Sequence, residues 1–376
     1  MGMGGSGFTS GSPVDGLAKR TANSKESDAP GPTLTTPSGF AGYIHNCSAS
    51  VAYYSKGHPL RSEDIPFPRP NRWWEDAAAL ITMQLVFGSA WVLPPLLLAC
   101  MIGSLVYGSK LASAFVVVTV AATFLPPGKR WEAFLHHWVW DAWRRYFRFR
   151  GVVPRPPFCD PGRHYIFAHF PHAVFPMGSW LSFPLCGEPL TGVPAPMLGL
   201  VATVLLQIPF FKHMFGWMGC QPADKPVTMR LLKVASVGII VEGVAGIFHG
   251  ATLQHERIFL KQRKGFIKCA IQSGADIVPV YHLGSSQMLR CTGSSEWSRR
   301  MRTSLCLFWG RWGLPLPYRH DIISLVGVPI RVVRKDTPSQ DEVDAVHQRF
   351  CEAITELFDT HKHLMPGWET KQLTIV

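Results

Sequence analysis

The stretch Phe167–Trp180, FAHFPHAVFPMGSW, passes from a strand-like run to a helix-like run, with one imidazole between them. Pro171 fixes its own φ and disfavours the helical region for Phe170, so the sequence predicts that the strand ends there and that His172 lies in the following turn. Such turns, at the carboxyl ends of strands, are where α/β proteins place reactive groups. His172 is therefore either a general base or a partly buried structural histidine, and this stretch alone does not decide between them.

Short apolar runs alternate with helical patterns from Gly151 onward, which predicts a layered α/β fold. The last helix carries a capping box, in which Ser339 precedes Glu342 by three residues. The expected strands are His164–Phe170, Val237–Glu242, Asp276–Gly284 and Asp321–Ile330, and the other expected helices are Ala173–Cys186 and Arg263–Ser273.

The composition favours anionic partners. The 376 residues are 47% hydrophobic and 16% charged, and the formal net charge is +12. This balance suits nucleic acid, phospholipid headgroups or a polyphosphate cofactor. Because the basic residues cluster beside apolar segments, we expect a membrane and a phosphorylated cosubstrate as partners and no nucleic acid. The nine cysteines are scattered without a Cys-x-x-Cys pair, so we expect a reducing environment and no metal.

Residues 1–72 read as a Gly-, Ser- and Pro-rich tail that we expect to be disordered, with no secretory signal. Gly2 and Ser6 match the N-myristoylation pattern, although tails of this composition also match it by chance.

Two uncharged runs follow, Ala77–Ser109 and Leu111–Gly128, each near the ~20 residues that span a bilayer. We expect a membrane hairpin over residues 73–127, turning at Tyr107–Lys110. The pair Pro94-Pro95 keeps a re-entrant hairpin open as the alternative. Basic residues flank both ends, which predicts that both termini are cytosolic.

Residues 128–150 carry an aromatic stripe at helical spacing together with arginines, which predicts an amphipathic helix at the headgroup level. Trp140 and Trp143 fall outside this stripe. A helix packed on the globular domain, which those two rings would also suit, is the alternative.

Four blocks in the second half of the chain allow a family comparison. They are FPHAVFPMG, LKQRKGFIKCAIQSGADIVPVYHLG, FWGRWGLPLPYRHDIISLVGVPIRV and SQDEVDAVHQRFCEAITELFDTHKHLM. In order and spacing they resemble the type-2 diacylglycerol acyltransferase family, which includes monoacylglycerol and wax-alcohol acyltransferases. The resemblance covers roughly residues 155–376. It implies a glycerolipid-acyltransferase-like α/β domain over residues 151–376, behind an N-terminal membrane helical hairpin.

The resemblance implies transfer of a fatty acyl group from acyl-CoA to a neutral lipid hydroxyl, with diacylglycerol as the first choice of acceptor. It places the protein in the endoplasmic reticulum membrane, with the lipid droplet as an alternative. Acyl-CoA is a cosubstrate, no permanently bound cofactor is implied, and a homo-oligomer is left open. His172 corresponds to the second histidine of the family's His-Pro-His-Gly motif and would be the base. A monoacylglycerol, a wax alcohol, a lysophospholipid or a catalytically silent scaffold are the alternatives.

The chain departs from the family pattern around this histidine. Phe170 and Ala173 replace the first histidine and the glycine of the motif. Glu242 stands at the first of the family's paired glycines, and Gly246 stands where the family has a glutamate. Glu242 is therefore the candidate carboxylate that orients His172, and a structural hydrogen-bonding role is its alternative.

Basic residues in two of the blocks are candidates for binding the phosphates of coenzyme A. Lys261, Arg263, Lys264 and Gly265 would open a helix, whose N-terminus favours an anion. A solvated basic helix start is the alternative. Arg311 and Arg319, in the third block, are further candidates.

Overall fold

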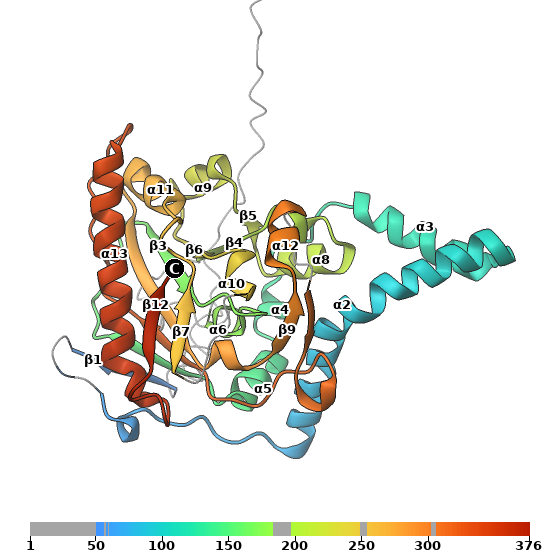
Figure 1. The fold of residues 1–376 in the computed structure, drawn as a ribbon, viewed down its shortest axis with the longest axis horizontal. Coiled ribbons are helices and arrows are strands. Elements are labelled where there is room, and N and C mark those ends of the chain that lie inside the picture. Colours follow the sequence, from blue (N-terminus) through green and yellow to red (C-terminus); the bar gives the residue numbers. More distant parts are fainter. Residues whose placement is uncertain (1–49, 56–57, 59, 183–196, 249–253, 302–305) are drawn as a thin grey trace, which may run out of the picture. The chain divides into compact units, whose positions relative to one another are not determined.

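The computed structural model describes residues 50–55, 58, 60–182, 197–248, 254–301 and 306–376. All of these belong to one compact unit, Phe40–Val376. Its centre is a mixed α/β fold (Figure 1), as the alternation of strand and helix patterns predicts.

The main sheet has eight strands in the order β1-β2-β11-β8-β3-β6-β4-β5. Neighbouring strands are parallel except β11 and β8, which are antiparallel. The four strands expected from the sequence are all present, as β3, β6, β8 and β11, with shorter ends. The bounds are β1 Val51–Tyr54, β2 Arg150–Pro154, β3 Tyr165–Phe170, β4 Leu198–Val201, β5 Gln221–Pro222, β6 Val237–Ile240, β8 Asp276–Leu283 and β11 Ile323–Val326.

Helices cover both faces of this sheet, because side chains alternate along each strand. On β3, Ile166 and Phe170 point into one apolar core, whereas Phe167 points into the other. The first core is closed by α9 Lys225–Leu231, α11 Gly265–Ser273 and α13 Gln340–His361. The second is closed by α5 Trp138–Tyr146, α6 Met177–Ser182, α8 Pro209–Trp217 and the first half of α2 Trp73–Tyr107.

Two small sheets and several short elements complete the fold. β7 His255–Ile258 pairs in parallel with β12 Gln372–Ile375, and β9 Arg290–Gly293 pairs antiparallel with β10 Cys306–Trp309. The other helices are α3 Lys110–Phe124, α4 Glu132–Leu135, α10 Ala245–Phe248 and α12 Ser295–Met301. The 3₁₀ turns are η1 Ser62–Asp64, η2 Thr203–Leu206, η3 Ser285–Gln287, η4 Arg311–Gly313 and η5 Lys362–Leu364.

The local signals around the two predicted helix starts have different outcomes. The capping box is confirmed: the Ser339 hydroxyl accepts from the Glu342 N–H at 3.2 Å, and the Ser339 N–H donates to the Glu342 carboxylate at 2.8 Å. The strand before His172 ends at Phe170, as expected. The next helix, however, begins at Met177 and not at Ala173, and the expected end at 183–186 lies outside the described residues.

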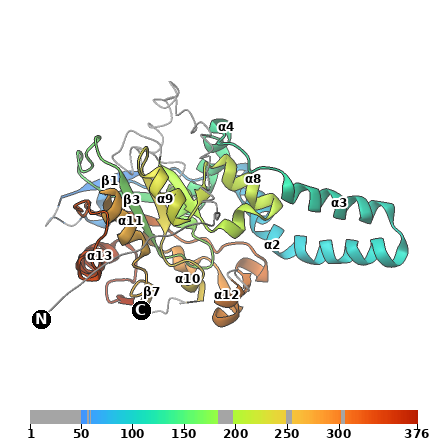
Figure 2. The same ribbon diagram turned by 90° about the horizontal axis from the view of Figure 1, so that it is seen from above.

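Helices α2 and α3 run antiparallel and project from the body (Figure 2). Gly108 has a φ of 60° and ends α2, and the Ser109 hydroxyl caps α3. The Ser104 and Ser113 hydroxyls hydrogen-bond across the pair at 2.7 Å. Pro94 and Pro95 lie inside α2 without ending it. By length and composition α2 could cross a membrane, whereas α3 is a shorter apolar helix.

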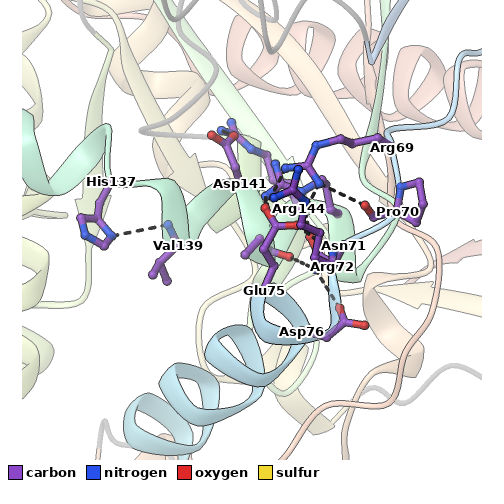
Figure 3. Close-up of polar contacts among 12 residues, drawn as sticks. Arg69, Pro70, Asn71, Arg72, Glu75, Asp76, His137, Val139, Asp141 and Arg144 are labelled. Atoms are coloured by element: carbon purple, nitrogen blue, oxygen red, sulfur yellow. Dashed lines mark hydrogen bonds and ion pairs between the residues drawn. The ribbon is translucent and has the colours of Figure 1, made fainter.

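The carboxylate of Glu75 binds the N-terminal end of α2 to α5 (Figure 3). Arg69 donates two hydrogen bonds to it, at 2.7 and 2.8 Å, and Arg145 on α5 donates a third at 2.9 Å. Asn71 adds a bond from its side-chain amide to the Ala142 carbonyl at 2.9 Å. These contacts fix the direction in which the apolar helix leaves the body.

Two expectations about the N-terminal half are corrected. The tail expected over residues 1–72 is ordered from Ser50 among the described residues, because β1 pairs with β2 and Ile65 is buried; residues 1–49 lie outside the description. The single helix expected over 128–150 is two helices, α4 and α5. Trp140 and Trp143 are buried in the core, as in the packed alternative.

Removal of the Glu75 carboxylate should weaken the contact between α2 and α5 and destabilise the fold. Glu75→Ala leaves Arg145 without its buried partner, and such losses cost about 3–5 kcal/mol. Glu63→Ala, which removes a solvent-exposed partner of Arg61, should cost less than about 1 kcal/mol. Thermal unfolding of the full chain in detergent compares the two, and equal shifts in midpoint would contradict this role of Glu75.

Candidate active site

His172 lies two residues past the carboxyl end of β3, near the start of the turn that leads to α6. Glu242 lies two residues past the end of β6, which is the parallel neighbour of β3. The carboxyl ends of parallel strands meet at one edge of a sheet, so the topology brings these two residues together.

The ring of His172 is held in one tautomer. Its Nδ1 lies 2.8 Å from the carbonyl oxygen of Ala173, and a carbonyl can only accept, so Nδ1 carries the proton. Nε2 is then the nitrogen with a free lone pair. The residue is half-buried, and burial lowers the pKa of the imidazole below its ordinary 6.5. The neutral, basic form is therefore the one present at neutral pH.

Ala173 holds this carbonyl in place with an uncommon backbone conformation. Its φ is 53°, in the left-handed region that glycine adopts without cost. The glycine that the family motif has here would fit this conformation more easily. The left-handed conformation occurs here with alanine nevertheless.

Glu242 is fully buried and fixes the main chain of this loop rather than the ring. One carboxylate oxygen accepts a hydrogen bond from the peptide N–H of His172. The other accepts from the N–H of Phe259 at 2.8 Å, just past the end of β7. The Glu242 carbonyl in turn accepts from the Arg263 guanidinium at 2.7 Å. The carboxylate thus joins three segments that are distant in sequence.

Burial raises the pKa of Glu242 to about 7. The two backbone N–H donors oppose this rise, and the nearby buried Glu256 adds to it. Glu256 is itself held by Lys371 at 2.9 Å, and both side chains are buried. The charge of Glu242 therefore changes close to neutral pH, unlike that of an exposed glutamate.

Gly246 leaves room for the Glu242 side chain. A Cβ at position 246 would lie 2.7 Å from the Cβ of Glu242 and 2.8 Å from the Cβ of His172. Side chains at 242 and 246 would therefore enter the same space. A carboxylate at 246, where the family has its glutamate, would approach His172 from that space.

The candidates for phosphate binding near α11 differ in the contacts that they make. Arg263 joins the His172 and Glu242 cluster, and its guanidinium lies over the Phe259 ring, 5.0 Å from the centroid. Lys264 pairs with Asp344 on α13 at 2.7 Å. Lys261 and Gly265 are exposed at the start of α11.

Arg311 and Arg319 gather instead around Tyr146 on α5. Arg311 donates to the Tyr146 hydroxyl at 2.9 Å, and Arg319 donates to its carbonyl at 3.2 Å and faces Asp76 at 3.4 Å. Their use by coenzyme A stays a prediction.

Sequence reasoning missed a pair of buried histidines next to this site. The Nδ1 of His169 on β3 lies 3.0 Å from the Nε2 of His282 on β8, and the Ser179 hydroxyl lies 3.3 Å from the same Nε2. Burial lowers the pKa of His169 to about 3, so this ring is neutral. The alternation of side chains along a strand predicts that His169 and Phe170 point to opposite faces of β3. It does not predict that His282 lies opposite His169.

No group of three or more His, Cys, Asp or Glu side chains suited to a metal ion occurs within the described ranges.

The comparison with known families decides what kind of enzyme this is. The family model described as "Diacylglycerol acyltransferase" matches residues 117–376. The chain belongs to the diacylglycerol acyltransferase family. It is therefore an acyltransferase, and the matched range contains His172, Glu242 and all the basic candidates.

Individual relatives of this acyltransferase carry the name of the same family. A cattle protein, "Diacylglycerol O-acyltransferase 2-like protein 6", is 31% identical over 66% of this chain and 81% of its own length. "Diacylglycerol O-acyltransferase 2" of Xenopus tropicalis is 27% identical over 82% of this chain and 93% of its own. Among solved structures, the 1-acyl-sn-glycerophosphate acyltransferase PlsC of Thermotoga maritima aligns with a TM-score of 0.36 and 14% identity, covering 70% of this chain and 95% of that one.

The raised pKa of Glu242 predicts a pH-dependent stability. Its pKa is about 7 when folded, against 4.5 as the ordinary value, so folding favours the protonated acid. Any stability from this group is complete below pH 4.5 and is lost as the pH rises through about 7. The shift corresponds to about 3 kcal/mol.

Glu242→Gln does not titrate and serves as the reference. The wild-type thermal midpoint, relative to that of Glu242→Gln, should fall as the pH rises from 4.5 to 7. Other titrating groups cancel in this difference. A difference that stays constant with pH would contradict the buried, titrating carboxylate.

Proposed function

We propose that this acyltransferase esterifies diacylglycerol to triacylglycerol with acyl-CoA, with His172 as general base. The observation that carries the proposal is the fixed tautomer of His172. Because Nδ1 is bound to the Ala173 carbonyl, Nε2 is the basic nitrogen, and the residue lies at the carboxyl edge of the sheet. The family and the names of its relatives support the choice of acceptor.

In the proposed reaction, Nε2 of His172 takes the proton of the acceptor hydroxyl as that oxygen attacks the thioester carbonyl. A tetrahedral intermediate forms and collapses with cleavage of the C–S bond. The coenzyme A thiolate leaves without needing a strong acid, because a thiol is far more acidic than an alcohol. The proton on His172 then passes to the thiolate or to solvent.

Glu242 is a positioning residue in this proposal. It binds the peptide N–H of His172 and the N–H of Phe259, so it sets where the base stands without touching the reacting atoms. Arg263 contributes by holding the Glu242 carbonyl. Lys261, Arg263, Lys264 and Gly265 would receive coenzyme A phosphate at the start of α11.

The proposal places the enzyme in the endoplasmic reticulum membrane, with both termini cytosolic. Buried residues of α2 end at Gly88, and the projecting part from Ser89 to Tyr107 is roughly 28 Å long at the helical rise. This is close to the ~30 Å thickness of the hydrocarbon core. Lys110 at the tip favours a hairpin that reaches the far headgroups, because a charge in hydrocarbon is costly.

Acyl transfer by microsomes containing the full chain tests the proposal. Labelled acyl-CoA is given with diacylglycerol, monoacylglycerol, a long-chain alcohol or a lysophospholipid. We expect ester formation with diacylglycerol, and a loss of about 10²–10⁴-fold in His172→Ala, the usual contribution of a general base. His172→Gln should be as inactive, and both variants should stay in the membrane. Ester with another acceptor would replace diacylglycerol, and an active His172→Ala enzyme would reject the base.

An exchange of the two neighbouring positions tests the role of the carboxylate. Glu242→Gly removes it, and Gly246→Glu crowds the site, so each single variant should lose most activity. The double variant Glu242→Gly with Gly246→Glu should recover part of it, because the carboxylate then enters the same space from position 246. A double variant no more active than Glu242→Gly would contradict this reading.

A further inference from the structure

Four large apolar side chains are exposed on α12, on β10, and in or just after η4. Trp297 on α12 is 58% exposed, Leu307 on β10 is 55% exposed, Trp312 in η4 is 73% exposed and Leu314 is 45% exposed. We name these four residues the Trp312 surface. They fall within 18 positions of the chain, and an exposed apolar patch marks a site of contact with a protein or a membrane.

Arginines accompany the aromatic rings of this region. The Arg300 guanidinium lies 5.9 Å from the Trp297 ring centroid, and that of Arg311 lies 4.5 Å from the Trp312 ring centroid. Residues 289–319 contain six arginines and one glutamate, with no lysine or aspartate. Tryptophan with arginine is the composition that proteins place at the headgroup level, and the positive balance favours anionic headgroups.

The strand that carries Leu307 packs against the apolar helix α2. Side chains alternate along β10, so Leu307 is exposed while Phe308 turns toward the body. The Phe308 ring contacts the Trp91 ring of α2, with 6.3 Å between centroids. Trp91 lies just past Gly88, where α2 leaves the body. In Figures 1 and 2, α12 lies on the side of the body from which α2 projects.

A short chain of contacts joins this surface to the active site. β9, the partner of β10, carries Cys291, whose thiol lies 3.6 Å from the Ile247 carbonyl of α10. The preceding residue, Gly246, packs against His172 and Glu242. A contact that immobilises the Trp312 surface would therefore also restrain α10, which lies next to His172.

We propose that the Trp312 surface is a second membrane contact, which docks on the anionic headgroups of the bilayer that α2 enters. Two contacts, the α2–α3 hairpin and this surface, fix the body against the membrane, whereas the hairpin alone would let the body tilt. The docked orientation presents the α10 side of the site to the bilayer, where a lipid acceptor resides. Only this last consequence rests on the proposed function.

Photo-crosslinking of the full chain in vesicles tests the contact. Trp297, Trp312 or Val333 is replaced by the photoreactive p-benzoylphenylalanine. Val333 is the matched control, because it is apolar and 88% exposed but follows Ile330, which bridges to Ile277 near the amino end of β8, away from the site. The same replacement at Ile102 on α2, 48% exposed, reports insertion of the helix. The vesicles contain labelled phosphatidylcholine, with or without labelled phosphatidylserine.

We expect lipid adducts at positions 102, 297 and 312, with yields at 297 and 312 several-fold above that at 333 and higher when phosphatidylserine is present. Yields at 297 and 312 no higher than at 333, while position 102 is labelled, would overturn the proposal. Adducts that do not depend on phosphatidylserine would overturn the assignment to anionic headgroups. Adducts to a protein in native membranes, in place of lipid, would overturn it in favour of a protein partner.

The result is independent of catalysis. Lipid adducts in a preparation without acyl transfer would reject the proposed function and leave the membrane contact standing. Acyl transfer without adducts at 297 and 312 would reject the contact alone.

Discussion

The buried carboxylate of Glu242 is the contact on which the active site depends. It accepts the peptide N–H of His172 with one oxygen and that of Phe259 with the other, so it ties the loop after β3 to the end of β7. Arg263 then ties the start of α11 to the Glu242 carbonyl. Without the carboxylate, the N–H groups of His172 and Phe259 would lose these bonds, at about 1–3 kcal/mol each. The cost of burying this acid appears as its raised pKa.

This arrangement explains how the site tolerates its departures from the family motif. Position 246 faces the same space as the Glu242 side chain, so a glycine there is required by the glutamate at 242. Ala173 keeps the left-handed turn that directs its carbonyl to Nδ1 of His172, although a glycine would adopt it with less strain. The base and its tautomer therefore depend on backbone positions more than on the identity of the neighbouring side chains.

Features encoded by neighbouring residues could be predicted from the sequence. The end of β3 at Phe170, the capping box of α13 and the turn containing His172 follow from proline, serine and glutamate at fixed spacings. Features that depend on distant contacts could not. The pairing of β1 with β2, the His169–His282 pair and the hydrogen bonds of Arg311 and Arg319 to Tyr146 arise only when the sheet assembles. Periodicity shows which face is apolar but not what covers it.

The most direct test of the central claim is an experimental structure of the full chain in a lipid environment, bound to a non-hydrolysable thioether analogue of acyl-CoA and to diacylglycerol. We expect the free hydroxyl of diacylglycerol to lie about 2.6–3.2 Å from Nε2 of His172, with Glu242 still bound to the His172 peptide N–H. A hydroxyl held elsewhere, with Nε2 enclosed by protein, would contradict it.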